Sequence, residues 1–368
     1  MTPGRLLPSP SAYRLTPPGK LMANLYLTEQ GAVLRKSSDR LIVTKDKATL
    51  LEVPCHEIDA VLIFGNVQFT TAAVRELMEH NIEMALFTRR GKLLCQLTPP
   101  MGKNVPMRLA QYERARDPAF ALAFAKQVVT AKVRNSLTLV RQYAYNHPDA
   151  DLQRALDELA GYTERIAAAA TTDELFGVEG NAARIYFTAF SRMLRGAVKF
   201  PGRRKRPAPD PVNALLSFGY TLLFNEIASL LDGVGFDPHI GFFHRPDYGR
   251  ASLAADLVEE FRAPVVDRLT LRLLNTRVFT PDDFYLQTNS GSMYLQRDSL
   301  RKYFTAYEEL LGEPLTELGK GTEDTTNSAT APAADAAANA HFRSAFRRQV
   351  YRLQAVVMDG VAYAPFEL

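Results

Sequence analysis

Residues 24–64 of the chain read NLYLTEQGAVLRKSSDRLIVTKDKATLLEVPCHEIDAVLIF. Short runs rich in Val, Ile and Leu alternate there with turn-forming residues such as Gly31, Asp39 and Asp46, which is the pattern of short β-strands. Because the segments between the runs are short, we expect antiparallel meanders rather than crossover connections. This stretch therefore predicts a β-rich start to the fold.

The β-rich region continues beyond these strands. Apolar residues at helical spacing predict a helix over 72–80, with Thr70 or Thr71 as its N-cap. A strand over 84–87 and a hairpin follow, and two prolines then end the pattern. We therefore expect a β-rich N-terminal domain over 23–98.

The rest of the chain has helical periodicity. The expected helices span 108–145 with a break at Pro118, 152–170, 173–194, 213–231, 252–274, 299–311 and 341–358. The sequence therefore predicts an α+β protein, in which an all-α-helical domain over 99–368 follows the β-rich domain.

Two segments are expected to stay outside both cores. Residues 1–22 are rich in proline and are predicted to be a flexible arm. Residues 319–340 contain no Leu, Ile, Val, Met or aromatic residue. Such a segment cannot bury enough apolar area to offset the entropy lost on ordering. We expect it to be a flexible insert in the helical domain.

The composition limits the class of protein. The chain has 368 residues, 46% of them hydrophobic, which is enough for about two domains. Its two cysteines, Cys55 and Cys95, exclude a disulfide scaffold and favour a reduced, cytoplasmic setting. The longest apolar stretch, 214–224, is shorter than the about 20 residues that a bilayer requires, so no membrane span is predicted.

Glu179 lies between two glycines, Gly177 and Gly180, in a predicted helix. A capping box formed by Thr171 and Glu174 is expected to start this helix. Each glycine costs a helix about 1 kcal/mol relative to alanine, which suggests that something approaches the backbone closely. Glu179 is then either a functional carboxylate on a small-residue face, or an incidental surface residue beside a tight helix–helix contact.

His244 precedes a predicted helix that carries Asp256 and Glu259. The i, i+3 spacing places both carboxylates on one side of that helix. A solvated acidic face and an ordinary surface histidine are one interpretation. The other is a metal site that also includes Glu179, because manganese accepts both carboxylate and imidazole ligands, whereas magnesium sites rarely use imidazole.

The distribution of basic residues is more informative than the net charge, which is only +4 from 44 basic and 40 acidic residues. Between 180 and 209 there are eight basic residues and no acidic one: Arg184, Arg192, Arg195, Lys199, Arg203, Arg204, Lys205 and Arg206. The last four lie between glycine and proline and are expected to form an exposed loop. This segment is either a solvated loop or a surface for DNA phosphates.

Several stretches in this order resemble one known family, the CRISPR-associated integrase and endonuclease of spacer acquisition ("Cas one"). The resemblance rests on NLYL (24–27), GVEGNAARIYF (177–187), RRKRPAPDPVNALLSFGY (203–220), GFFH (241–244), LAADLVEEFR (253–262) and YAPF (363–366). These motifs are spread from residue 24 to residue 366, so together they make a far more specific match than any one of them.

The resemblance implies a fold, a site and partners. It implies a β-sandwich-like N-terminal domain and a helical catalytic domain, and we expect the β-rich domain to form the dimer contact because its strand edges and apolar faces need covering. It implies that Glu179, His244 and Glu259 hold a divalent Mn or Mg ion, with Asp256 as a supporting acidic residue. Its implied reaction inserts DNA fragments into a repeat array by attack of a 3′-hydroxyl on a phosphodiester. The implied partners are DNA, a second copy of the chain and a small ferredoxin-like protein ("Cas two").

Two other functions remain open on the residues alone. One is a different metal-dependent, structure-specific nuclease for repair or junction resolution. The other is a non-catalytic scaffold that binds nucleic acid. No motif for nucleotide hydrolysis, dinucleotide binding or serine hydrolysis is present in a suitable context.

Overall fold

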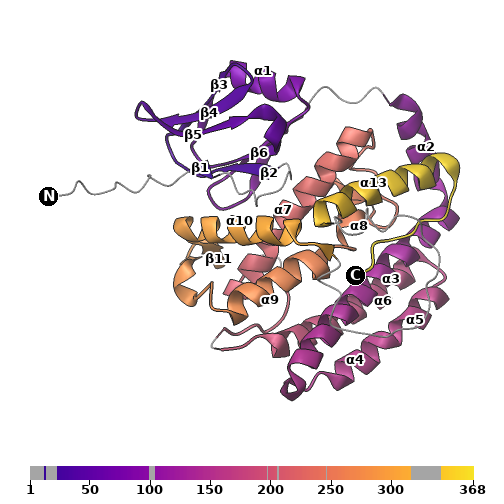
Figure 1. Cartoon of the computed structure of the whole chain (residues 1–368). Helices are drawn as coiled ribbons and strands as arrows, with labels where there is room; N and C mark the ends of the chain where they lie inside the picture. Colours follow the sequence, from indigo (N-terminus) through magenta and orange to yellow (C-terminus); the bar gives the residue numbers. More distant parts are fainter. Residues whose placement is uncertain are drawn as a thin grey trace. The chain divides into compact units, whose positions relative to one another are not determined.

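The computed structural model describes residues 12–13, 23–98, 104–196, 198–204, 207–245, 247–315 and 341–368 (Figure 1). The chain divides into two compact units: Met1–Met101 with Tyr303–Glu309, and Gly102–Lys302 with Leu310–Leu368. Apart from Ala12–Tyr13, the expected arm over 1–22 lies outside the described residues, and so does the insert over 319–340.

The first unit contains two β-sheets and one α-helix of its own. A five-stranded sheet has the order β1-β2-β6-β8-β9, and a four-stranded sheet has the order β5-β4-β3-β7. The elements are β1 (Ala12–Tyr13), β2 (Ala23–Leu27), β3 (Val33–Ser37), β4 (Arg40–Lys45), β5 (Ala48–Pro54), the 3-10 turn η1 (Cys55–Glu57), β6 (Ile58–Phe64), β7 (Gln68–Phe69), α1 (Thr71–Glu79), β8 (Glu83–Phe87) and β9 (Leu93–Leu97).

Both sheets and α1 share one apolar core. Leu27 and Val61 come from the five-stranded sheet, Leu34 from the other sheet and Leu77 from α1, and all four are almost completely buried. The burial of such side chains is the main force that holds two sheets together. The predicted two-sheet, sandwich-like N-terminal region is therefore confirmed, and Thr70 caps α1 by accepting a hydrogen bond from the Ala73 amide.

The prediction of antiparallel meanders is right for the run from β3 to β5 but wrong for other strand pairs in both sheets. Strands β3, β4 and β5 pair antiparallel, but β2–β6, β6–β8 and β3–β7 are parallel pairs. The physical reason is that the chain leaves the five-stranded sheet after β2 and forms three strands of the four-stranded sheet over residues 33–54. It then returns to the five-stranded sheet and places β6 beside β2. Helix α1 then makes the crossover that a parallel β6–β8 pair requires.

One segment of the predicted helical domain belongs to the first unit. It is Tyr303–Glu309, the middle part of α10 (Arg297–Gly312). The ring of Phe304 stacks on Tyr26 at 4.2 Å, and the Tyr26 hydroxyl donates a 2.6 Å hydrogen bond to Glu308. Sequence periodicity shows which face of a helix is apolar but not which distant strand will cover it.

The second unit is built mainly from helices (Figure 1). These are α2 (Val105–Arg116), α3 (Pro118–Asn146), η2 (Pro148–Ala150), α4 (Gln153–Ala160), α5 (Tyr162–Ala168), α6 (Thr172–Met193), α7 (Pro211–Val234), α8 (Ser252–Val258), the π-helical segment η3 (Arg262–Asp267), α9 (Arg268–Asn275), η4 (Pro281–Asp283), the ends of α10, and α13 (Phe342–Asp359). The break expected at Pro118 is confirmed, because Asp117 caps α3 and Pro118 is its first residue.

The second unit is not all-α as predicted. Strands β10 (Phe284–Gln287) and β11 (Ser292–Leu295) form an antiparallel hairpin, in which Tyr285 lies opposite Tyr294. Gly291 in the turn has φ of 62°, a left-handed conformation that glycine adopts at little cost. Two runs of only four residues were too short for their alternation to stand out.

Helix α7 lies in the core of this unit. Asp210 caps its start, and Gly235, with φ of 105°, is the C-cap that follows its last residue, Val234. By length and composition alone α7 could cross a membrane, but 61% of its most apolar window is buried within the protein, as in a core helix.

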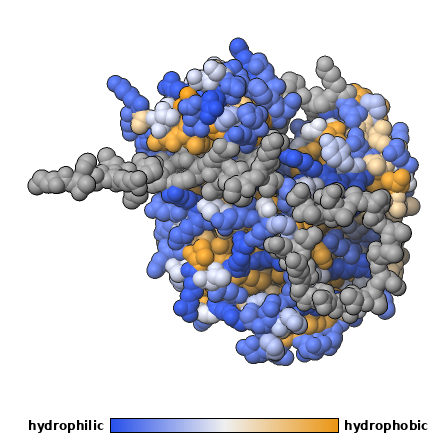
Figure 2. Space-filling model, in the orientation of Figure 1, coloured by the Kyte–Doolittle hydropathy of each residue, from blue (hydrophilic) through white to orange (hydrophobic). Residues whose placement is uncertain are grey.

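Much of the face shown in Figure 2 is hydrophilic, with smaller apolar areas between.

The single helix predicted over 252–274 is interrupted. Helix α8 ends at Val258, the π-helical segment η3 follows, and α9 begins at Arg268. Pro264 explains the change, because proline cannot donate the hydrogen bond that continues an α-helix. The interruption places Glu259 at the C-cap of α8 and Arg262 at the first position of η3, rather than on one regular helical face.

Candidate active site

Helix α6 positions Glu179 in the second unit. The Thr171 hydroxyl accepts a 3.2 Å hydrogen bond from the Glu174 amide, as predicted. Glu174 itself accepts from the Ala170 amide at 2.7 Å, so the reciprocal half of the predicted capping box is not formed. A Cβ atom placed on Gly177 or Gly180 would meet nothing within 4 Å. The two glycines therefore make no tight contact with another part of the described chain, so the alternative of a close helix–helix contact at this point is wrong.

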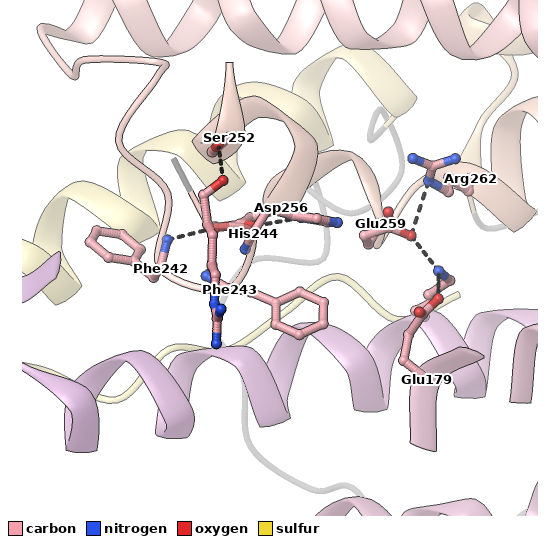
Figure 3. A network of polar contacts seen from close by, with 10 residues as sticks. Glu179, Phe242, Phe243, His244, Ser252, Asp256, Glu259 and Arg262 are labelled. Atoms are coloured by element: carbon pink, nitrogen blue, oxygen red, sulfur yellow. Dashed lines mark hydrogen bonds and ion pairs between the residues drawn. The ribbon is translucent and has the colours of Figure 1, made fainter. Parts of the chain in front are cut away.

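Glu179 and Glu259 share one lysine. Lys132 on α3 donates a hydrogen bond to Oε1 of Glu179, and its Nζ lies 2.7 Å from Oε2 of Glu259 (Figure 3). Arg262 Nε lies 3.0 Å from the same Glu259 oxygen. Two carboxylates that are 80 residues apart in the sequence (259 − 179) are thus joined by a single ammonium group.

The charges in this cluster stabilise one another. Burial raises the pKa of Glu259, but the positive charges of Arg262 and Lys132 outweigh it and hold the pKa at about 2. Burial lowers the pKa of Lys132, and the charges of Glu259 and Glu179 more than offset this effect, so the pKa is raised overall. The two groups are therefore an ionised carboxylate and an ammonium ion near neutral pH.

Asp256 holds the loop that carries His244. Its carboxylate is completely buried and accepts hydrogen bonds from the amides of Phe242 (2.7 Å), Phe243 (3.0 Å) and His244 (2.8 Å). Nδ1 of His244 lies 2.7 Å from the same carboxylate, so Nε2 is the ring nitrogen left for another partner. A Cβ on Gly241 would lie 2.8 Å from Asp256, so glycine is required there.

The carboxylates of Asp256 and Glu259 do not belong to a solvated acidic face. Asp256 is 0% exposed and Glu259 is 4% exposed. That interpretation of the i, i+3 pair is therefore wrong. Its premise was one regular helix with one apolar stripe, whereas every residue of α8 is buried.

Glu260 anchors the site on its other side. Its buried carboxylate accepts hydrogen bonds from the Tyr363 hydroxyl and, at 2.6 Å, from the Phe366 amide. Burial raises the pKa of Glu260 to about 7, against the lowering effect of these hydrogen bonds. The YAPF stretch at 363–366 therefore holds Glu260 and so fixes the backbone directly after Glu259.

The predicted ligand residues meet at one cavity of about 540 Å³. Glu179, His244 and Glu259 all line it, together with Lys132 and Arg262. In the part of the chain that the structure describes, no three His, Cys, Asp or Glu side chains lie close enough together to form a metal cluster. Between the two glutamates the structure places the Lys132 ammonium instead.

Three observations show that the residues at this cavity fit a divalent cation. Oε2 of Glu259 is buried and accepts no hydrogen bond of suitable geometry, although the cationic groups of Lys132 and Arg262 lie near it. An ammonium ion already occupies the space between the two carboxylates, so a positive charge is stable there. Asp256 on Nδ1 of His244 is also the partner that orients a metal-binding imidazole.

The predicted basic residues have different surroundings. Arg203 is half-buried and donates hydrogen bonds to Asn213 (2.9 Å) and Ser217 (3.1 Å), so it is not part of a solvated loop. Arg184 and Arg203 line the cavity, while Arg204 is exposed. The other predicted contacts are Arg192, bound to Asp151, Arg195, bound to Tyr143, and the exposed Lys199. Lys205 and Arg206 lie outside the described residues.

A buried polar cluster closes one wall of the cavity. Asp267 accepts hydrogen bonds from the hydroxyls of Tyr186 (2.8 Å) and Tyr220. The guanidinium groups of Arg203 and Arg262 lie 5.3 Å and 4.5 Å from the centre of the Tyr220 ring. These contacts hold both guanidinium groups against the Tyr220 ring at the cavity.

Asp267 predicts a pH effect on stability. Burial raises its pKa from 3.8 to about 6, against the lowering effect of the tyrosine hydrogen bonds. The pKa of Asp267 is higher in the folded protein than in the unfolded chain, so the protonated carboxyl is the form that suits the buried site. Its contribution to the free energy of unfolding is complete below pH 3.8 and is lost as the pH rises through about 6. We expect Asp267→Asn to gain up to about 3 kcal/mol relative to wild type between pH 4 and 7 in urea unfolding. A constant difference across that range would contradict this assignment.

Lys132 and Asp267 are among the site residues whose roles sequence reasoning missed, as are Glu260 and Arg262. Lys132 stands out in the sequence only as a basic residue, and nothing in its spacing links it to Glu179, 47 positions away. Asp267 follows an apolar run, and only the fold shows that two tyrosines point at it.

Comparisons with known proteins identify the family of the chain. A family model described as "CRISPR associated protein Cas1" matches residues 25–309. The chain is 35% identical over 301 residues to the CRISPR-associated endonuclease Cas1 2 of Rhodospirillum rubrum, covering 79% of this chain and 86% of that protein.

Solved structures are similar in fold. A casposase bound to an integration product has a TM-score of 0.77 at 22% identity, covering 94% of this chain and 93% of that chain. A chain of a Cas6-RT-Cas1–Cas2 complex has a TM-score of 0.74 at 23% identity, covering 97% of this chain and 37% of that chain. From the family match and the identity to the Rhodospirillum rubrum protein, the chain belongs to the Cas1 family of CRISPR-associated endonucleases.

Proposed function

We propose that this protein is a metal-dependent DNA endonuclease and integrase that inserts DNA fragments as new spacers into a CRISPR array. The observation that carries the proposal is one cavity that is lined by Glu179, His244 and Glu259 and also by the basic residues Arg184 and Arg203. The reaction is a transesterification, in which a 3′-hydroxyl of the fragment attacks a phosphodiester and the 3′-oxygen of the broken strand leaves. Membership of the Cas1 family and the cytoplasmic setting expected from the free cysteines agree with it.

Glu179, Glu259 and Nε2 of His244 are the groups that would hold a Mn or Mg ion. When bound, such an ion polarises the phosphodiester and neutralises its charge. Because the set mixes two carboxylates with an imidazole, manganese suits it better than magnesium.

The remaining residues position the site and bind the backbone of DNA. Asp256 fixes the direction of the His244 ring, and Glu260 fixes the backbone next to Glu259. Arg184 and Arg203 line the cavity, where their positive charges favour a phosphate. No residue has to form a covalent bond with DNA, because the attacking group belongs to the fragment.

Arg204 is the best-placed described residue of the basic loop for DNA outside the cavity. Its side chain is exposed, while the side chain of Arg203 is held by Asn213 and Ser217. We expect Arg204→Ala to weaken binding of all duplexes alike and to reduce the salt slope of log K by about 1, because phosphate contacts carry no sequence information. Fluorescence anisotropy at several salt concentrations measures both, with Arg75→Ala on α1 as the exposed control. An unchanged slope would remove Arg204 from the DNA surface.

The reaction also requires an assembly. Two ends of a fragment must join opposite strands at a fixed separation, and one chain has only one set of Glu179, His244 and Glu259. We therefore propose a homodimer, formed through the β-rich unit, that acts with a small Cas2-like partner. A closed two-fold dimer is the commonest way to duplicate a site.

A strand-joining assay tests the function. The purified protein and Mn²⁺ are mixed with a labelled duplex that has free 3′-hydroxyls and with a supercoiled plasmid carrying repeats. We expect the label to become covalently attached to relaxed plasmid. Cleavage of DNA without attachment would favour the structure-specific nuclease, and no metal-dependent product would contradict an enzymatic role.

A further inference from the structure

The position of Lys132 between two carboxylates has no role in the proposed reaction. Its ammonium bonds Oε1 of Glu179 and lies 2.7 Å from Oε2 of Glu259, and its side chain is only 19% exposed. Lys132 comes from α3, Glu179 from α6 and Glu259 from the end of α8. One flexible side chain therefore links three separate elements at the centre of the site.

The two carboxylates need a positive charge between them. Glu179 is 20% exposed at its side chain and Glu259 only 5%, so water screens their repulsion poorly. Arg262 contacts Glu259, and its guanidinium group is also held in place by the Tyr220 ring. Of the cations in these ion pairs, only Lys132 bridges both glutamates, so its loss would leave Glu179 without its charge partner.

We propose that Lys132 is a built-in counter-ion, which holds Glu179 and Glu259 together in the metal-free protein and is displaced from between them when a divalent cation binds. This inference rests on the proposed metal site. The same two oxygens face the ammonium and would face the ion. Metal–oxygen bonds of about 2.0–2.2 Å leave no room for an ammonium in that gap.

The protein has the means for such an exchange. Lysine carries its charge on four flexible methylene groups, so its head can swing away without movement of α3. Lys132 lines the 540 Å³ cavity, which offers a place for the displaced ammonium. The exchange has a cost, because the ion must break one ion-paired bridge before it forms its own bonds.

Two opposite effects of removing the charge follow. Without metal, Lys132→Met leaves the buried Glu259 and the half-buried Glu179 without the charge between them, and we expect the melting temperature to fall by about 4 °C or more. With metal, the competitor is gone and the repulsion between ammonium and ion is removed, so we expect Mn²⁺ to bind about tenfold more tightly.

The experiment measures Mn²⁺ binding by titration calorimetry and melting in EDTA or in saturating Mn²⁺, using the full chain. Lys126→Met is the matched control, because Lys126 is also on α3 and bonds only the Ala167 carbonyl in the contacts seen. Lys132→Gln, which loses the charge but keeps a hydrogen-bond donor, provides a second variant if Lys132→Met does not fold. We expect both Lys132 variants to bind Mn²⁺ more tightly than wild type and the control to match wild type.

The outcomes separate the two ideas. If wild type binds no Mn²⁺, the proposed metal site fails and this inference fails with it. If wild type binds Mn²⁺ and the Lys132 variants bind it equally or more weakly, the metal site stands and the counter-ion role is overturned. In that case Lys132 assists the ion instead of competing with it.

Discussion

Glu179→Gln is expected to reduce strand joining by about 10³-fold or more. The change removes the charge of one proposed metal ligand and keeps the size of the side chain, so the loss would reflect the charge. Glutamine can still accept a hydrogen bond from Lys132, which preserves the packing of α6 against α3. Initial rates of label attachment to plasmid, measured at saturating DNA and several Mn²⁺ concentrations, provide the test.

Glu158→Gln is the control for this variant. Glu158 lies on the surface of α4 and bonds Arg154 at 2.7 Å in an exposed i, i+4 pair, which contributes little to stability. We expect it to join strands at the wild-type rate. If Glu179→Gln retained more than a tenth of the wild-type rate at saturating Mn²⁺, the assignment of Glu179 as a ligand would be wrong.

The fold was predictable where the signal is local. Alternating apolar runs located the strands of the first unit, and Pro118, Thr70 and Thr171 marked helix starts that the structure confirms. The parallel pairing of β2 with β6 was not predictable, because it depends on where the intervening residues go. The position of Tyr303–Glu309 in the first unit depends likewise on a contact between distant segments.

The site shows the same division. The residue types and the family resemblance selected Glu179, His244, Asp256 and Glu259, and the structure brings three of them to one cavity with Asp256 behind. The ion pair of Lys132 was hidden because no rule of spacing connects residues on three separate elements. Arg203 was misjudged for a related reason, since an Arg-rich stretch is usually solvated and only Asn213 and Ser217 turn this one inward.

Asp256→Ala is expected to destabilise the protein by about 4 kcal/mol. Three backbone amides, of Phe242, Phe243 and His244, would lose their acceptor inside the protein, and each unsatisfied buried donor costs about 1–3 kcal/mol. Asp256→Asn keeps the shape but replaces one acceptor oxygen with a donor, so we expect a loss of about 2 kcal/mol. Urea unfolding at neutral pH measures both values.

The comparison with an exposed aspartate shows whether burial is the cause. Asp173 bonds Arg245, next to His244, but its side chain is 71% exposed, and we expect Asp173→Ala to change stability by less than about 0.5 kcal/mol. Strand joining should fall in both Asp256 variants even where they are fully folded, because the His244 ring would lose the partner on Nδ1 that fixes its direction. A folded Asp256→Asn protein with wild-type joining would show that the loop alone orients His244, and that Asp256 serves stability only.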